Sequence, residues 1–468
     1  MSWNKENLEI FIEIYRDNPC LWKETENNTA NQSSNSSTAT KPKRKTTSNT
    51  QFLEACQRAL EKNITETTEY EAVGINVAKK LDKMKNTQAI YAETLINTIL
   101  STGLSNQLTP NTAIFEDKHN DLHSFFFFRW KSGVGSSLNY ISLKQPIDKS
   151  SFLIPYPSWE ANTIPSNKTD LKPDHIISTF RIKSDVCDRL WVMDTGVDDI
   201  LGSYNVVASP AIVIFDLKTD TLIKRYELKK DDAKDSSFFA NIVVDVDKDN
   251  CNDAYAYIPD LGGYGIVIYS LASDDSWRVE HNFFHFDPLQ GDLTVGGVNF
   301  HWTDGVFGIA LSNKLENGHR TAFFHSLAST KEFGVCTSIL KNKTAATTPG
   351  NYYAFKVLGD KGDDSQTSAS DFDPNSEVLF FTQLQKDGVA CWNTKKALAP
   401  ENVALVAEDG ERLVFTNDIK LARDEPYLYI LSDRMPEFLY GKLDQSKINY
   451  RIFRLNVNEA IKGTPCAG

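Results

Sequence analysis

The stretch RLWVMDTG at residues 189–196 opens a segment that repeats one strand-rich unit as far as Leu311. The repeat continues through DLGGYGIVIYS (260–270) and HWTDGVFGIAL (301–311). Short runs of β-forming residues bounded by Gly, Asp and Asn are typical of strands joined by tight turns. No long helical period interrupts them, so this part of the chain is predicted to be all-β.

The same unit recurs on both sides of that segment. Inner strands are predicted to start near Asn111, Ser178, Ala240, Thr303, Ser368 and Thr416. A spacing of roughly 50 to 65 residues suits the blades of a propeller, and a closed ring leaves only short exposed edges. We therefore predict a six-bladed β-propeller over residues 111–466. Residues 101–115 either supply its closing strand or leave the ring poorly sealed.

These runs resemble the Yellow and major royal jelly protein family of insects. The resemblance starts near Asn111 and passes through FRWKSGVGSSLNYI (128–141). Further matching runs are SASDFDP (368–374), GVACWNT (388–394), TNDIKLARD (416–424), LSDRMPEFLY (431–440) and NYRIFRL (449–455). Several long motifs in one order make the match specific.

The resemblance implies a propeller that binds a small aromatic amine or catechol-derived ligand in its central channel, linked to insect pigmentation. It also implies an alternative, a dopachrome-converting isomerase of melanin formation. Members of the family are typically exported, so a secreted protein is expected, although the N-terminal sequence lacks the apolar core of a signal peptide. The ligand itself cannot be named from the sequence.

The starts of the inner strands are predicted to converge on one mouth of the channel, where small ligands bind in propellers. Aromatic rings could stack on a flat ligand, and a carboxylate could hold its ammonium group. The candidate ligand residues are Ser178, Asn241, Phe300, Thr303, Asp304, Thr367, Ser368, Phe415, Asn417 and Asp418. An alternative for each polar residue is that it only caps a turn.

For catalysis, a tautomerase needs a general base and a proton donor near the substrate. The candidates are His301 and His175, against the alternative that each is a surface or structurally satisfied histidine. No Gly-x-Ser-x-Gly elbow, phosphate loop or His-Glu-x-x-His helix occurs. Neither a metal nor a cofactor is therefore predicted.

The N-terminal part reads differently from the rest. Residues 1–26 predict a helical fragment that resembles the start of the MADF domain of insect DNA-binding proteins. Residues 27–50 predict a disordered linker, and residues 51–100 a helical segment. The linker contains KPKRK (41–45), which is either a nuclear localisation signal or a solvated basic patch. A nuclear DNA-binding protein is thus a third alternative.

Bulk properties narrow these choices. A net charge of −12 disfavours nucleic acid as a partner of the whole chain, and no apolar run is long enough to span a membrane. A monomer is expected.

Cysteine and asparagine positions add two expectations. Matched turn positions predict a Cys187–Cys251 disulfide, and a second bridge, Cys391–Cys466, would tie down the C-terminal tail, with Cys336 left free. The sequons at Asn167 and Asn342 would carry glycans if the chain is exported.

Overall fold

The computed structural model describes residues 122–126, 134–142, 153–200, 202–422, 425–444 and 446–468, together with 77, 79, 80 and 83. The chain divides into two units, and the four isolated residues belong to the first, residues 1–118 with 146–151. The second unit, residues 119–145 and 152–468, contains all the sheets. The predictions for residues 1–26, 27–50, Asn111 and nearly all of 51–100 lie outside the described residues.

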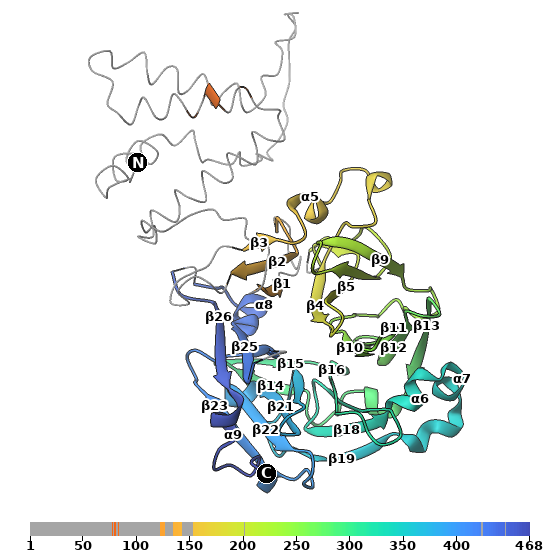
Figure 1. Cartoon of the computed structure of the whole chain (residues 1–468). Coiled ribbons are helices and arrows are strands. Elements are labelled where there is room, and N and C mark those ends of the chain that lie inside the picture. Colours follow the sequence, from red (N-terminus) through yellow and green to blue (C-terminus); the bar gives the residue numbers. More distant parts are fainter. Residues whose placement is uncertain are drawn as a thin grey trace, which may run out of the picture. The chain divides into compact units, whose positions relative to one another are not determined.

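Four consecutive four-stranded antiparallel sheets form most of the second unit (Figure 1). The first consists of β4 (Thr179–Ser184), β5 (Arg189–Asp194), β8 (Ala211–Asp216) and β9 (Thr221–Glu227). The second consists of β10 (Val243–Asp247), β11 (Asn250–Asp260), β12 (Gly265–Ser270) and β13 (Asp275–Glu280). The third consists of β16 (Val306–Leu311), β17 (Thr321–Ser326), β18 (Lys331–Cys336) and β19 (Lys356–Asp360). The fourth consists of β20 (Ser370–Asp373), β21 (Val378–Gln383), β22 (Gly388–Asn393) and β23 (Val403–Glu408).

A fifth blade has three strands within the described residues: β24 (Thr416–Leu421), β25 (Tyr427–Asp433) and β26 (Tyr450–Asn456). In every blade the strands follow one another in sequence order, and first strands of neighbouring blades touch across the centre. Strands β5, β12, β21 and β22 are buried throughout, whereas the outermost strands β9 and β23 are only partly buried. The predicted all-β propeller is therefore confirmed.

The predicted number of six blades is wrong, because the structure shows five. Five inner strands start within three residues of the predicted positions, but the sixth was expected near Asn111. The sheet that follows that position is short: β1 (Leu122–Phe126), β2 (Leu138–Ser142) and β3 (Ile154–Pro155). Its last strand has two residues and ends in a proline, which cannot donate to a further ladder.

The loops between blades carry two small hairpins and several short helices. The hairpins are β6 (Val197–Asp198) with β7 (Asn205–Val206), and β14 (Asp292–Val295) with β15 (Val298–His301). The α-helices are α5 (Trp159–Asn162), α6 (Thr337–Lys341), α7 (Lys343–Thr347), α8 (Met435–Tyr440) and α9 (Val457–Ile461). The 3-10 turns are Lys168–Asp170, Asn282–Phe284, Pro349–Ala354, Leu384–Lys386 and Pro400–Asn402. No helix in the described ranges has the length and apolarity needed to cross a bilayer.

Apolar side chains between blades form the core. One cluster joins Ile268 of the second blade to Ile309 and Phe324 of the third, and all three are fully buried or nearly so. A second joins Trp191 to Ile258 and Tyr269 across the first and second blades. Each such side chain contributes roughly 1.5–3 kcal/mol by leaving water, so the blades stabilise one another face to face.

Both predicted disulfides are present. Cys187 and Cys251 join the first turns of two neighbouring blades, and Cys391 in β22 binds Cys466 near the C-terminus. Their Cα separations are 5.9 Å and 6.1 Å, which is normal for the bond. Cys336 is the free cysteine among the residues that the structure describes, as predicted.

Candidate ligand site at the channel mouth

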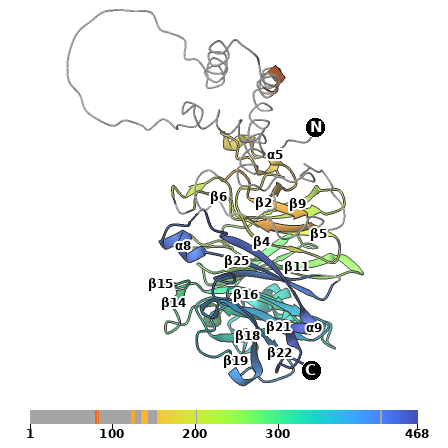
Figure 2. The same cartoon turned by 90° about the vertical axis from the view of Figure 1, so that its left-hand side faces the viewer.

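One face of the propeller gathers the starts of the inner strands. Because β4, β10, β16, β20 and β24 each begin a blade and each next strand runs antiparallel, first strands start and second strands end on the same face. Figure 2 shows hairpin β14–β15, hairpin β6–β7 and α8 together on one side of the ring. We call this side the mouth of the channel.

The candidate ligand residues differ in their exposure at the mouth. Those that are buried are Ser178, Asn241, Phe300, Thr367, Ser368, Phe415 and Asp418. Asp304 and Asn417 are partly buried, and Thr303 is exposed. Only a few of these side chains are therefore open to a ligand without rearrangement.

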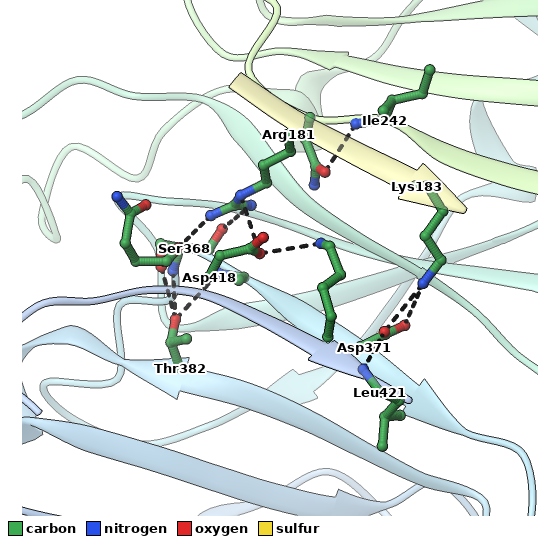
Figure 3. A network of polar contacts seen from close by, with 12 residues as sticks. Arg181, Lys183, Ile242, Ser368, Asp371, Thr382, Asp418 and Leu421 are labelled. Atoms are coloured by element: carbon green, nitrogen blue, oxygen red, sulfur yellow. Dashed lines mark hydrogen bonds and ion pairs between the residues drawn. The ribbon is translucent and has the colours of Figure 1, made fainter. Parts of the chain in front are cut away.

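The channel below the mouth is crossed by Arg181 of β4 (Figure 3). Its Nη1 donates to the Ser368 carbonyl at 2.9 Å, and its Nη2 donates to the Asn417 carbonyl. The guanidinium also lies over the ring of Phe307, 4.2 Å from its centroid. One buried arginine of the first blade thus ties together the third, fourth and fifth blades.

Asp418 is an ionic partner of Arg181 in the channel. Its Oδ1 lies 3.2 Å from Arg181 Nε and 3.1 Å from Lys420 Nζ. Farther along the same strands, Lys183 Nζ lies 3.1 Å from Asp371, which also accepts the Leu421 amide at 2.9 Å. We call Arg181, Lys183, Asp371, Asp418 and Lys420 the ionic plug. Asp418 is fully engaged inside it.

Three further predicted residues serve the framework. Asn241 Nδ2 donates to the Phe307 carbonyl at 2.9 Å, and Asn241 Oδ1 accepts the next backbone amide. Ser368 Oγ donates to the Thr416 carbonyl at 2.8 Å, and Thr367 Oγ1 donates to the Ser365 carbonyl at 2.9 Å. The bonds to Phe307 and Thr416 join neighbouring blades, and all of these bonds satisfy buried polar groups.

Aromatic rings cover the mouth. Phe300 stacks on Tyr440 at 5.5 Å, and Trp302 meets Phe415 edge to face at 5.9 Å. Trp302 Nε1 also donates to the Tyr440 hydroxyl. Phe300 comes from hairpin β14–β15 and Tyr440 from α8, so two insertions bring their rings together over the channel. We call Phe300, Trp302, Phe415 and Tyr440 the aromatic cluster.

Asp304 lies two residues from Trp302, where β16 begins. Burial raises the pKa of its carboxyl to about 6. Among the described residues nothing donates a hydrogen bond or an ion pair to this carboxylate. It is therefore ionised near neutral pH without a counter-charge, which distinguishes it from Asp418.

Asp433 was missed by the sequence reasoning. It ends β25 at the mouth, is only 5% exposed, and accepts the Asn417 side-chain amide at 2.7 Å and the Met435 backbone amide at 3.0 Å. Burial raises the pKa of its carboxyl to about 6. A signal was available, because WVMD (191–194), YIPD (257–260) and ILSD (430–433) all end second strands with Asp.

The two candidate histidines are not part of the aromatic cluster. The His301 side chain is 75% exposed and sits 3.3 Å from Asp292 on its own hairpin. His175 is buried, its ring nitrogen accepts the Lys172 amide at 3.4 Å, and burial lowers its pKa. Neither ring contacts the cluster in the described part of the chain.

A second charged group, also missed, is buried between the third and fourth blades. Glu332 Oε2 lies 3.0 Å from His325 Nδ1 and 3.2 Å from Lys361 Nζ, and all three side chains are inaccessible to water. His325 fills the space beside Gly308, where an added Cβ would lie 2.0 Å from the ring. This packing explains the glycine in an inner strand.

Metal binding finds no support in the described ranges, where no cluster of three or more His, Cys, Asp or Glu side chains could hold an ion. The mouth instead offers flat rings and uncompensated carboxylates. Such a surface can bind a flat cationic ligand.

Comparison with known proteins agrees with the fold and the motifs. The sequence model of the major royal jelly protein family matches residues 177–466. Dopaminechrome tautomerase of Drosophila melanogaster is 34% identical over 411 residues, covering 85% of this chain and 88% of that protein. L-dopachrome tautomerase yellow-f of the same species is 37% identical over 339 residues, covering 72% of this chain and 78% of that protein. Protein yellow of that species is 39% identical over 343 residues, covering 72% of this chain and 61% of that protein. This chain therefore belongs to the family of Yellow and major royal jelly proteins.

Proposed function

We propose that this protein binds a small aromatic amine or catechol-derived ligand at the channel mouth, in a role linked to pigmentation. The observation that carries the proposal is Asp304, a carboxylate two residues from Trp302 of the aromatic cluster that has no counter-charge among the described residues. A ligand ammonium would relieve the cost of that isolated charge, and the ligand ring would stack on the cluster. Relatives named for dopachrome and dopaminechrome conversion support the same class of ligand.

Of the two predicted carboxylates, Asp304 rather than Asp418 is the proposed partner of the ligand ammonium. Asp418 already has two cationic partners, so an ammonium would have to displace Arg181 or Lys420. Displacing a buried partner leaves its charge unpaired and costs several kcal/mol. Asp304 needs no such exchange.

An isomerase is the second candidate, and the raised pKa values at the mouth favour it. A carboxyl with a pKa of about 6 can accept a proton at neutral pH and release it again. In a dopaminechrome tautomerisation two ring carbons each lose a proton and the two quinone oxygens each gain one. The carboxylate would take each carbon proton in turn and return it to an oxygen through water. No oxidant is consumed, and no cofactor is part of the proposal.

We further propose that the protein works outside the cell, as a monomer. Two disulfides fit an oxidising compartment. Both sequon asparagines, Asn167 and Asn342, are exposed and so accessible to glycosylation. The nuclear alternative draws no support from the residues that the structure describes.

Calorimetric titration of the purified protein with dopamine and serotonin tests the binding proposal. Micromolar binding that is lost in Asp304→Asn, with no loss of folding stability, is the expected result. Equal affinity in both proteins would remove Asp304 from the site. Loss of dopaminechrome absorbance with and without protein decides between a binder and an isomerase.

A further inference from the structure

The five second strands end in a ring of residues around the mouth. In blade order they are Asp194, Asp260, Ser326, Gln383 and Asp433. Three of the five are aspartates at equivalent positions. Their surroundings show which of them keeps an uncompensated charge.

In the first two blades an arginine neutralises the aspartate. Asp194 Oδ2 lies 3.1 Å from Arg225 Nη2, and Asp260 Oδ2 lies 2.8 Å from Arg278 Nη1. Both arginines stand on the fourth strand of their blade, β9 or β13. Backbone amides also donate to both carboxylates: Ser178 N–H to Asp194 at 2.9 Å, and Phe238 N–H to Asp260 at 2.7 Å. These two carboxylates are structural.

The fifth blade lacks this arrangement. It has three strands in the described part of the chain, so no arginine of a fourth strand reaches Asp433. Asp433 has two neutral donors, Asn417 and Met435, and no cation among the described residues. The next residue, Arg434, pairs instead with Glu437 at 2.8 Å. Asp433 thus holds a buried negative charge at the mouth.

The cations of the ionic plug do not compensate for this charge. Arg181 uses its guanidinium on two carbonyls, on Asp418 and on the Phe307 ring. Lys183 and Lys420 face Asp371 and Asp418. A carboxylate entering the mouth would therefore meet Asp433 and Asp304, and no described arginine is left unpaired there to hold it.

We propose that the mouth selects ligands without a carboxylate, so that amines and dopaminechrome-type molecules are preferred to amino acids and L-dopachrome-type molecules. This inference rests on the proposed function and names its substrate class. L-DOPA and dopamine share the catechol and the ammonium group and differ only in the carboxylate. A like charge about 6 to 12 Å away, at an effective dielectric constant near 20, weakens binding roughly hundredfold to tenfold.

The test measures two matched pairs by calorimetry: dopamine with L-DOPA, and serotonin with 5-hydroxytryptophan. The parent protein is expected to bind each amine at least about tenfold more tightly than its amino acid. Asp433→Asn is expected to narrow that ratio, because it removes the charge and keeps the shape. Ser326→Ala is the control at the equivalent, uncharged position of the third blade and leaves the ratio unchanged. Conversion rates of dopaminechrome and L-dopachrome give a second readout.

The outcomes separate this inference from the proposed function. Tight binding of both members of each pair would overturn the selectivity and leave the binding function intact. A preference for amines that survives in Asp433→Asn and Asp433→Ser would remove Asp433 as its cause. No binding of any amine would overturn the proposed function, and the inference with it. Because the parent ratio is measured directly, a variant that fails to fold does not block the test.

Discussion

Asp304 and Asp418 occupy similar places in the sequence but differ in the structure, where only Asp418 has cationic partners among the described residues. Each follows a polar residue at the start of an inner strand, in WTDG (302–305) and FTND (415–418). The fifth blade has a register shift between Thr416 and Asp418, and Asp418 pairs there with Arg181 and Lys420. Asp304 precedes β16 and has no such partner among the residues that the structure describes. A carboxylate is therefore available for a ligand only where the framework does not use it.

The largest test of this contrast is Arg181→Met. It leaves Asp418 buried with Lys420 alone and removes the bonds to two carbonyls. We expect the free energy of unfolding to fall by about 3–5 kcal/mol. Chemical denaturation measures this, with Lys183→Met as control. The Lys183–Asp371 pair is more exposed, so its loss should cost only about 1 kcal/mol. Equal losses would show that the ionic plug is not centred on Arg181.

Asp304→Asn should weaken ligand binding without weakening the fold, the reverse of Arg181→Met. Dopamine binding is expected to weaken by about 2–4 kcal/mol, because a desolvated ammonium loses its carboxylate. The free energy of unfolding should not fall and should rise near neutral pH, because the variant removes a carboxylate whose ionised form is disfavoured by burial. Calorimetry and denaturation of the same sample check both halves. A destabilised protein with normal affinity would make Asp304 a framework residue like Asp418.

Acidification sharpens the contrast further. The pKa of Asp304 is about 6, and only the ionised carboxylate holds an ammonium. Dopamine affinity should therefore be full near pH 7 and fall through about pH 6, approaching tenfold per pH unit below it. Folding responds in the opposite direction. The folded state binds more protons than the unfolded chain between about pH 4 and about pH 6, so this carboxyl's contribution to stability is lost as pH rises through that window.

Titrations between about pH 7 and about pH 5 measure the slope. Asp304→Asn should flatten it, and Asp433, with a pKa also about 6, accounts for any slope that remains. An affinity independent of pH over this range would exclude both carboxylates as partners of the ammonium.

The smallest effect is expected for His301→Ala. The side chain is mostly exposed and faces only Asp292 on the surface of hairpin β14–β15. Dopamine affinity and unfolding should both stay within about 0.5 kcal/mol of the parent, and any dopaminechrome conversion should persist. A large loss of conversion in this variant would return the catalytic role to His301 and take it from the carboxylates.

Local patterns predicted the fold well. The alternation in ANIVVDVD (240–247) and similar runs located five inner strands. Alternating burial along a strand depends only on the order of neighbouring residues, so the sequence shows it directly. The Cys187–Cys251 bridge followed from matched turn positions. The number of blades did not follow, because the sixth start was placed near Asn111 and the sheet that follows that position is short.

Contacts between blades limited the prediction of the site. Nothing near Asp418 in the sequence indicates that Arg181 binds it, since the two residues come from the first and fifth blades. Whether a mouth residue is free depends on partners that only the closed ring brings together. Asp433 shows the same limit, since its motif also occurs at Asp194 and Asp260 but their arginines lie on strands that the fifth blade does not show.

The Cys391–Cys466 bridge encloses the fifth blade in a covalent loop. Asp433, Asn417 and Tyr440 all lie within that loop, so the part of the mouth they form is fastened at both ends to the fourth blade. A protease that cuts between α8 and β26 would leave two fragments joined through sulfur, and they would separate on a gel only after reduction. The bridge thus holds the site together even after this surface connection has been cut.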